Sequence, residues 1–302
     1  MSRIEEAIRK AKAAAQAKIE VSTARALGDA DQGSTRSLRS SELEQVAPFP
    51  MRQPFTPEHT LKLDRTALRT AGLLPPEQDE HRLVTEYRAL KRGLLGASTG
   101  PESQSTRARS IMVASALPGE GKTFTALNLA LSFAAERDFS VILIDADVAK
   151  PNLSTLLGLQ SERGLLDCLA EPGASLLDVM WGTDLPGLIL IPAGRSSENA
   201  TELLSSARMR ALLGETKQLD QRTIIVFDSP PVLLTSESRA LADVVNQIML
   251  VVRADSTPRN AVTQAVAALG AGRPVGLMLN QVKSATFGHY YGKRYGSADQ
   301  SA

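Results

Sequence analysis

Hydrophobic positions follow an alternating pattern along the chain between about residues 109 and 283. Short apolar runs, several of them rich in Val and Ile, occupy 111–115, 141–145, 188–192, 223–228, 247–252 and 275–280. The stretches between these runs have helical spacing. Near-continuous apolar strands that alternate with helices are typical of a parallel sheet covered on both faces. The pattern therefore predicts an α/β fold with a doubly wound, mostly parallel sheet.

The first 79 residues have a different composition. Residues 1–20 carry apolar side chains at helical spacing with Arg and Lys between them, which predicts an amphipathic N-terminal helix. Residues 21–79 are rich in Ser, Thr, Pro and Gln, so we expect a mostly disordered linker there. Within it, Asp64 is positioned to start one short helix at about 64–71.

We expect the main domain to cover residues 80–283. It opens with a second amphipathic helix, at about 80–95, with Tyr87, Leu90 and Leu94 on one side. Residues 284–302 are polar, apart from clustered aromatics, and read as a flexible tail.

Composition excludes several classes of partner and site. A net charge of +1 over 302 residues argues against nucleic acid as a partner. A lone Cys168 and the lack of a secretory leader pattern predict a cytoplasmic protein. No apolar run approaches the roughly 18 residues that a membrane span needs, so membrane association would require a partner. The three His are scattered, which predicts no transition-metal cluster.

The segment Ala116–Thr123 (sequence ALPGEGKT) lies between an apolar run and a helical pattern. Strand, Gly-rich turn, Lys-Thr and helix together are typical of a phosphate-binding P-loop, although Ala116 replaces the usual first Gly. Lys122 is expected to reach the phosphates and Thr123 to hold Mg²⁺. The alternative is an ordinary Gly-rich turn. The residues predicted to bind the nucleotide are Leu117, Pro118, Gly119, Glu120, Gly121, Lys122, Thr123 and Phe124.

Three aspartates follow two of the apolar runs: Asp145, Asp147 and Asp228. Ligands of an open parallel sheet bind outside the carboxyl ends of its strands, so we expect these carboxylates to converge near the P-loop. Asp228 and Asp147 are candidate Mg²⁺ ligands together with Thr123. Asp145 is the candidate group facing a substrate hydroxyl. The alternative is that these aspartates only cap the following helix or turn.

Two features lie near the C-terminus. Asn280 ends the last apolar run, where it is predicted to contact the nucleotide base, although Asn is also an ordinary turn residue. Three of the four tyrosines, Tyr290, Tyr291 and Tyr295, cluster in the polar tail. Such a cluster suggests sites that another active centre modifies, whereas a short edge strand at 287–291 is the alternative.

These motifs in combination resemble the bacterial tyrosine kinases, which are relatives of the MinD/ParA ATPases. The P-loop, the Asp145-Ala146-Asp147 motif followed by Lys150-Pro151, the Asp228-Ser229-Pro230-Pro231 motif and the tyrosine tail carry the resemblance. The opening Met1–Ala7 and the segment Glu86–Lys91 are similar to a subgroup of soluble tyrosine autokinases tied to exopolysaccharide chain-length and exosortase systems.

The resemblance implies an enzyme that transfers the γ-phosphoryl group of ATP, with Mg²⁺, to tyrosines of a neighbouring subunit. Lys122, Asp145 and Asp147 would be the catalytic residues, and Tyr290, Tyr291 and Tyr295 the phosphoacceptors. The family implies a ring-shaped homo-oligomer and activation by a membrane polysaccharide co-polymerase. That partner would bring the protein to the periphery of the inner membrane.

The chain departs from the family pattern at three places. Ala149 stands where an Arg usually follows the second Asp, with Lys150 next. The family's Glu-x-x-Arg-x-x-Arg oligomerisation motif matches Thr85, Arg88 and Lys91. Leu117 occupies the position of the signature Lys of MinD/ParA ATPases, which favours a kinase over a positioning ATPase. A positioning ATPase and a nucleotide switch without kinase activity remain the alternatives.

Overall fold

A computed structural model describes residues 57–97, 109–136, 138–216, 222–270 and 272–282. The predicted N-terminal helix, the tail tyrosines and most of the predicted linker lie outside these ranges. The described residues all belong to the second of two units of the chain, Arg52–Ala302.

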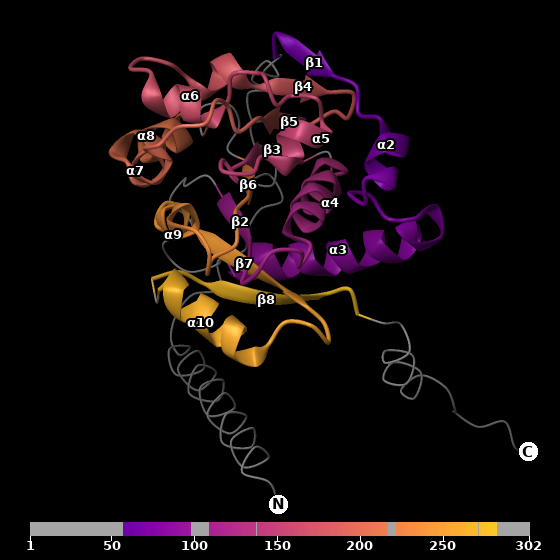
Figure 1. Cartoon of the computed structure of the whole chain (residues 1–302). Helices are drawn as coiled ribbons and strands as arrows, with labels where there is room; N and C mark the ends of the chain where they lie inside the picture. Colours follow the sequence, from indigo (N-terminus) through magenta and orange to yellow (C-terminus); the bar gives the residue numbers. More distant parts are fainter. Residues whose placement is uncertain (1–56, 98–108, 137, 217–221, 271, 283–302) are drawn as a thin grey trace, which may run out of the picture. The chain divides into compact units, whose positions relative to one another are not determined.

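Eight strands form one sheet, in the order β1-β4-β5-β3-β6-β2-β7-β8 (Figure 1). Every neighbouring pair is parallel except β4–β5, which is antiparallel. The doubly wound, mostly parallel sheet predicted from the apolar runs is therefore confirmed. The strands are β1 His59–Leu61, β2 Arg109–Ser115, β3 Ser140–Asp145, β4 Trp181–Thr183, β5 Leu188–Ile191, β6 Thr223–Asp228, β7 Gln247–Arg253 and β8 Val275–Asn280.

Helices cover both faces of this sheet. Among the described helices, none is long and apolar enough to cross a membrane. The helices are α2 Arg65–Thr70, α3 Glu77–Ala97, α4 Lys122–Ala134, α5 Asn152–Leu156, α6 Leu165–Ala170, α7 Ala200–Ser205, α8 Ala207–Glu215, α9 Ser236–Ala242 and α10 Arg259–Leu269, with a 3-10 turn, η2, at Leu176–Val179.

The alternation of side chains along β2 divides the core into two layers. Ile111 and Val113 pack with residues of α2, α3 and α4, whereas Met112 and Ala114 pack with residues of α6 to α10. Successive side chains of a strand point to opposite faces, so a strand with helices on both sides is apolar at every position. This is why the central strands read as continuous apolar runs.

Residues 57–79 differ from the expected linker, because the described part is folded onto the domain. β1 pairs with β4, and Leu63, Leu68 and Leu73 are buried with the α3–α4 layer. The predicted short helix is present as α2, and Asp64 caps it by accepting a 2.9 Å hydrogen bond from the Ala67 amide. The leucines recur every five residues, which matches neither strand nor helix periodicity, so the pattern gave no sign of burial.

Candidate active site

The P-loop connects the end of β2 to the start of α4. Gly119 and Gly121 have φ values of 78° and 94°, a left-handed conformation that favours glycine. A Cβ on Gly121 would also lie 2.2 Å from the Asn280 side-chain nitrogen, which leaves no room for a larger residue. The loop ends at the N-terminus of the 13-residue α4, where free backbone amides favour an anion. The predicted strand–turn–helix context is therefore present.

Lys122, the first residue of α4, points toward the acidic motif after β3. Its Nζ lies 3.1 Å from Oδ2 of Asp147, and their side chains are 11% and 7% exposed. The pair places a nearly buried ammonium group at the end of the P-loop, at the start of α4. Buried charges persist when they are paired, so Asp147 fixes the Lys122 ammonium at the site.

The three aspartates converge as expected. Asp145 and Asp228 are register partners on the neighbouring parallel strands β3 and β6, and Asp147 follows two residues later. All three are at most 5% exposed. Three buried carboxylates with one neighbouring ammonium leave an excess of negative charge, which raises the free energy of the fully ionised site.

Hydrogen bonds from the chain occupy the Asp145 carboxylate. Its Oδ2 accepts from the amide and the hydroxyl of Ser154, at 2.8 and 2.7 Å, and its Oδ1 accepts from the Asp147 amide at 3.2 Å. Ser154 Oγ in turn accepts from the Ala193 amide at 3.0 Å. Burial raises the pKa of Asp145 to about 6, helped by the Asp147 charge, while the hydrogen bonds from Ser154 oppose this shift. Asp145 therefore ties α5 and the segment after β5 to the end of β3.

Asp228 has the opposite environment. It is fully buried, and neither oxygen accepts a hydrogen bond from any described residue. Burial, and then the charge of Asp145, raises the pKa of Asp228 to about 8, against the Lys122 charge and the neighbouring Thr123 hydroxyl. An orphaned buried carboxylate beside a Thr hydroxyl suits a hard divalent cation, which would supply the missing partner.

The described residues contain no group of three or more His, Cys, Asp or Glu arranged to hold a metal unaided. This finding is compatible with Mg²⁺ bound through one or two protein groups and the phosphates of a nucleotide. The predicted metal residues Thr123, Asp147 and Asp228 fit such a shared site.

The other predicted nucleotide residues are distributed around the P-loop. Pro118 and Gly119 are exposed at its tip. Glu120 is buried, and its Oε2 accepts from the Leu117 amide at 2.9 Å. Asn280 donates from Nδ2 to the Glu120 carbonyl at 2.9 Å. These contacts place Asn280 against the loop backbone, as part of the cradle.

Phe124 lies on another side of α4 from the aspartates. It lines a pocket of about 510 Å³ together with residues of α2, α3 and their connection. The tail tyrosines Tyr290, Tyr291 and Tyr295 lie outside the described residues.

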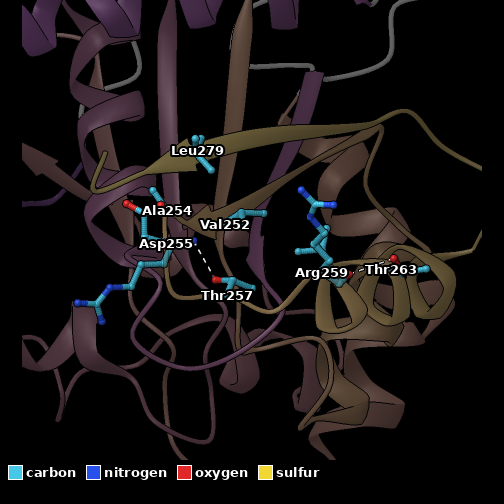
Figure 2. A pocket seen from close by; sticks show the side chains of 9 residues that line it. Val252, Ala254, Asp255, Thr257, Arg259, Thr263 and Leu279 are labelled. Carbon is cyan, nitrogen blue, oxygen red and sulfur yellow. Dashed lines mark hydrogen bonds between the residues drawn. The ribbon is translucent and has the colours of Figure 1, made fainter. Parts of the chain in front are cut away.

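A pocket of about 540 Å³ adjoins the P-loop at the carboxyl end of β7. Figure 2 shows Val252, Asp255 and Thr257 on β7 and the following loop, Arg259 on α10 and Leu279 on β8. The Thr257 hydroxyl accepts from the Arg253 amide at 3.0 Å and donates to Glu120 Oε1. The pocket wall and the P-loop are thus in direct contact.

Two residues of the site escaped the sequence analysis, Ser154 and Thr257. Ser154 lies nine positions after Asp145 in a polar stretch, and no motif marks it. Thr257 precedes Pro258 at the start of α10, a pattern that indicates a helix start. That pattern predicts local capping and carries no sign of a contact with Glu120.

The segment matched to the family's oligomerisation motif lies on α3. Lys91 is 3% exposed, and its Nζ contacts the Ser132 carbonyl and Glu136 Oε1, both at 2.5 Å. The ammonium also lies 5.6 Å from the centre of the Phe133 ring. Arg88 is exposed. One of the three matched positions is therefore committed to contacts within the subunit.

Comparison with known proteins places this geometry in a family. Residues 111–289 match the CobQ/CobB/MinD/ParA nucleotide binding domain. The chain is 30% identical to the tyrosine-protein kinase YwqD of Bacillus subtilis over 216 residues, covering 71% of this chain and 86% of that protein. It is 32% identical to the tyrosine-protein kinase CpsD of Streptococcus agalactiae over 191 residues, covering 61% of this chain and 82% of the other.

Solved kinase structures share the fold. The kinase domain of Escherichia coli tyrosine kinase ETK superposes with a TM-score of 0.59 at 30% identity, covering 70% of this chain and 81% of that one. The VpsO kinase domain gives a TM-score of 0.55 at 32% identity, covering 68% and 98%. With its P-loop, its converging aspartates and these relatives, the chain belongs to the bacterial tyrosine-protein kinases built on the CobQ/CobB/MinD/ParA nucleotide-binding domain.

Proposed function

We propose that this protein is an autokinase that transfers the γ-phosphoryl group of ATP to the tyrosines of its own C-terminal cluster in a neighbouring subunit. The single observation that carries the proposal is the site at the ends of β2, β3 and β6. There a P-loop, a buried Lys122–Asp147 pair and the unpartnered Asp228 carboxylate meet. Membership of the tyrosine-kinase family and the cluster Tyr290, Tyr291 and Tyr295 support tyrosine as the acceptor.

The surroundings of the P-loop support an assignment of the residues that would hold ATP and Mg²⁺. The P-loop amides and the N-terminus of α4 suit the phosphates, while Thr123 and Asp228 suit the cation. Bound Mg²⁺ would supply positive charge that offsets the charge of the phosphates.

Lys122 supplies the positive charge of the site. The ion pair with Asp147 holds the Lys122 ammonium close to the P-loop. The ammonium would therefore need little movement to exchange Asp147 for a phosphate oxygen. Such a preorganised cation stabilises the charge that develops on a transferring phosphoryl group. Asp147, once released from Lys122, would then be available to hold the cation.

Asp145 is the candidate group on the acceptor side. Its carboxylate is fixed by Ser154 and the Asp147 amide, so it cannot swing freely. Oδ2 already accepts two hydrogen bonds, whereas Oδ1 accepts one. Because a carboxylate oxygen can accept two, Oδ1 can take one more donor, such as a tyrosine hydroxyl. In that role Asp145 would orient the hydroxyl in line with the phosphorus.

A mixing experiment tests transfer between subunits. A Lys122→Met protein with an intact tail is mixed with an active protein in which Tyr290, Tyr291 and Tyr295 are all Phe, and ATP and Mg²⁺ are added. We expect phosphotyrosine on the Lys122→Met chain, with a yield that rises with protein concentration. The wild-type protein alone serves as the positive control.

Two outcomes would contradict parts of the proposal. Label on wild type but none on the Lys122→Met chain would confine transfer to one subunit. ATP hydrolysis by wild type without any phosphotyrosine would instead favour the positioning ATPase or the nucleotide switch.

The biological setting is the regulation of exopolysaccharide synthesis or export through a membrane polysaccharide co-polymerase partner. The proposal rests on the likeness of the Met1–Ala7 and Glu86–Lys91 segments to exopolysaccharide-associated autokinases. The burial of Lys91 against α4 means that ring contacts through α3 would use Arg88 and its exposed neighbours. Size-exclusion chromatography with light scattering, on wild type and Arg88→Ala, tests this use of α3.

A further inference from the structure

The P-loop contains a buried carboxylate, Glu120, two residues before the phosphate-binding Lys122. An acidic side chain in an anion-binding loop would weaken binding if its charge faced the ligand. In this structure Glu120 is only 3% exposed, and donors of the chain occupy both of its oxygens. Its role therefore lies in the contacts that it makes within the protein.

Two connections join Glu120 to the ends of β7 and β8. In the first, the Arg253 amide donates to the Thr257 hydroxyl, which donates to Glu120 Oε1. In the second, the Ala254 amide donates to the Asn280 carbonyl at 2.9 Å, and the Asn280 side chain donates to the Glu120 carbonyl. Both connections end on the same residue of the P-loop.

Glu120 also closes the loop on itself. Its Oε2 accepts from the Leu117 amide, three residues earlier, at 2.9 Å. The loop is thus curled by an internal bond, while the second oxygen of the same carboxylate holds it to the β7–α10 connection. A hydrogen bond to an ionised group is stronger than one between neutral groups, so a carboxylate suits this double use.

We propose that Glu120 and Thr257 form a brace that holds the P-loop in its nucleotide-binding conformation before the nucleotide arrives. In this role both are positioning residues, because they act through the loop backbone. The inference rests on the proposed ATP site and deepens it. It assigns a function to Thr257, which lies outside the P-loop and lines the pocket of Figure 2.

The expected effect follows from population arithmetic. A ligand that binds one loop conformation has an apparent dissociation constant equal to its intrinsic value divided by the fraction of molecules in that conformation. If loss of the brace lowers this fraction from nearly all molecules to about a tenth, the apparent dissociation constant rises about tenfold. Chemistry after binding uses the same loop conformation, so kcat should change much less than KM for ATP.

The test compares three variants at one pocket. Thr257→Val removes the hydroxyl with little change in shape, and Thr257→Ser keeps it. Thr263→Val is the matched control, because Thr263 lines the same pocket but its hydroxyl, among the described residues, donates to the Arg259 carbonyl within α10. The readout is the affinity for a non-hydrolysable ATP analogue with Mg²⁺, measured by titration calorimetry on the full-length chain.

We expect Thr257→Val to weaken binding about five- to tenfold, and Thr257→Ser and Thr263→Val to stay within about twofold of wild type. Both substitutions break the same hydrogen bond, between Thr257 and Glu120. The double variant Glu120→Gln with Thr257→Val should therefore bind the analogue no more weakly than whichever single variant has the lower affinity. In the nucleotide-free protein, amide hydrogen exchange of the P-loop should be faster in Thr257→Val and wild-type-like in Thr257→Ser.

Wild-type affinity in Thr257→Val, or an equal loss in Thr257→Ser, would overturn the brace. Strictly additive effects in the double variant would do the same. If Thr257→Val failed to fold, Glu120→Gln alone with the hydrogen-exchange readout would decide. The brace and the kinase can fail separately, because binding of the analogue requires no phosphoryl transfer and the mixing experiment requires no change at Thr257.

Discussion

The carboxyl ends of β3 and β6 lie side by side and carry aspartates in opposite environments. Asp145 accepts three hydrogen bonds from the chain, whereas Asp228, its register partner, accepts none from the described residues. The β3 end is therefore organised by the protein itself. The β6 end holds a buried carboxyl group without a hydrogen-bond partner among the described residues, which favours a group from outside such as a hydrated cation. Two strand ends of one sheet thus divide structural and ligand-binding roles.

Lys122 is the cation shared by both strand ends, so its loss should have the largest effect. We expect Lys122→Met to lower the rate of autophosphorylation by about 100-fold or more, because a preorganised charge on the phosphoryl group is removed. Initial rates of phosphotyrosine formation measure this. The variant should keep the circular dichroism spectrum of wild type, and activity within a few-fold of wild type would remove Lys122 from its assigned role.

Asp228→Asn and Asp145→Asn should differ in their effect on Mg²⁺-dependent nucleotide binding. We expect Asp228→Asn to weaken Mg²⁺-dependent binding of a non-hydrolysable ATP analogue by about 10- to 100-fold, the range for lost metal-site partners. Asp145→Asn should stay within about threefold while phosphoryl transfer falls. Titrations with and without Mg²⁺, and kinase rates for both variants, measure this; an equal loss of binding in both would contradict the division of roles.

Loss of the hydrogen bonds at the end of β3 should lower the free energy of unfolding. Ser154→Ala removes the hydroxyl that bonds to Asp145 and leaves the buried Ala193 amide without its acceptor. We expect a loss of about 1–2 kcal/mol in the free energy of unfolding. Thr155→Ala, the next residue on α5 and exposed, is the matched control and should change stability by less than about 0.5 kcal/mol. Urea denaturation measures both, and equal losses would show that the Ser154 hydroxyl is not stabilising.

The sequence predicted much of this molecule, because its central strands and P-loop depend on local spacing. Six of the eight strands correspond to apolar runs, and the glycines and Lys-Thr of the P-loop are adjacent in sequence. The two missed strands, β1 and β4, are three residues long and largely polar or mixed. Runs this short carry no measurable periodicity.

The difference between Asp145 and Asp228 could not be read from the sequence. Both follow an apolar run of similar length, and only the folded chain brings Ser154 to one of them. The same holds for Thr257 and Glu120, which are 137 positions apart. Motif spacing thus locates the groups of the site, while tertiary contacts decide which of them remain free for a ligand.

The smallest expected effect is a pH dependence that only the nucleotide-free protein shows. The pKa of Asp228 is about 8 in the folded protein, against 3.8 as its ordinary value. Between these values the folded chain binds more protons than the unfolded chain, so the free energy of unfolding falls as pH rises. The contribution is complete below about 3.8 and is lost as pH rises through the folded pKa. Asp145, with a pKa of about 6, acts in the same direction at lower pH.

Asp228→Asn removes this loss, because Asn carries no charge at any pH. We therefore expect the melting temperature of wild type to fall by about 2–4 °C more than that of Asp228→Asn between pH 7.0 and 8.5, equivalent to about 1 kcal/mol. The measurement is thermal unfolding in EDTA without nucleotide, at constant ionic strength. Groups that change charge equally in both proteins cancel in the difference. Parallel curves for the two proteins would show that ionisation of Asp228 does not destabilise the nucleotide-free fold. The variant that binds Mg²⁺-nucleotide less tightly should thus be the more stable protein at pH 8.5, because the carboxylate that favours the cation destabilises the fold without it.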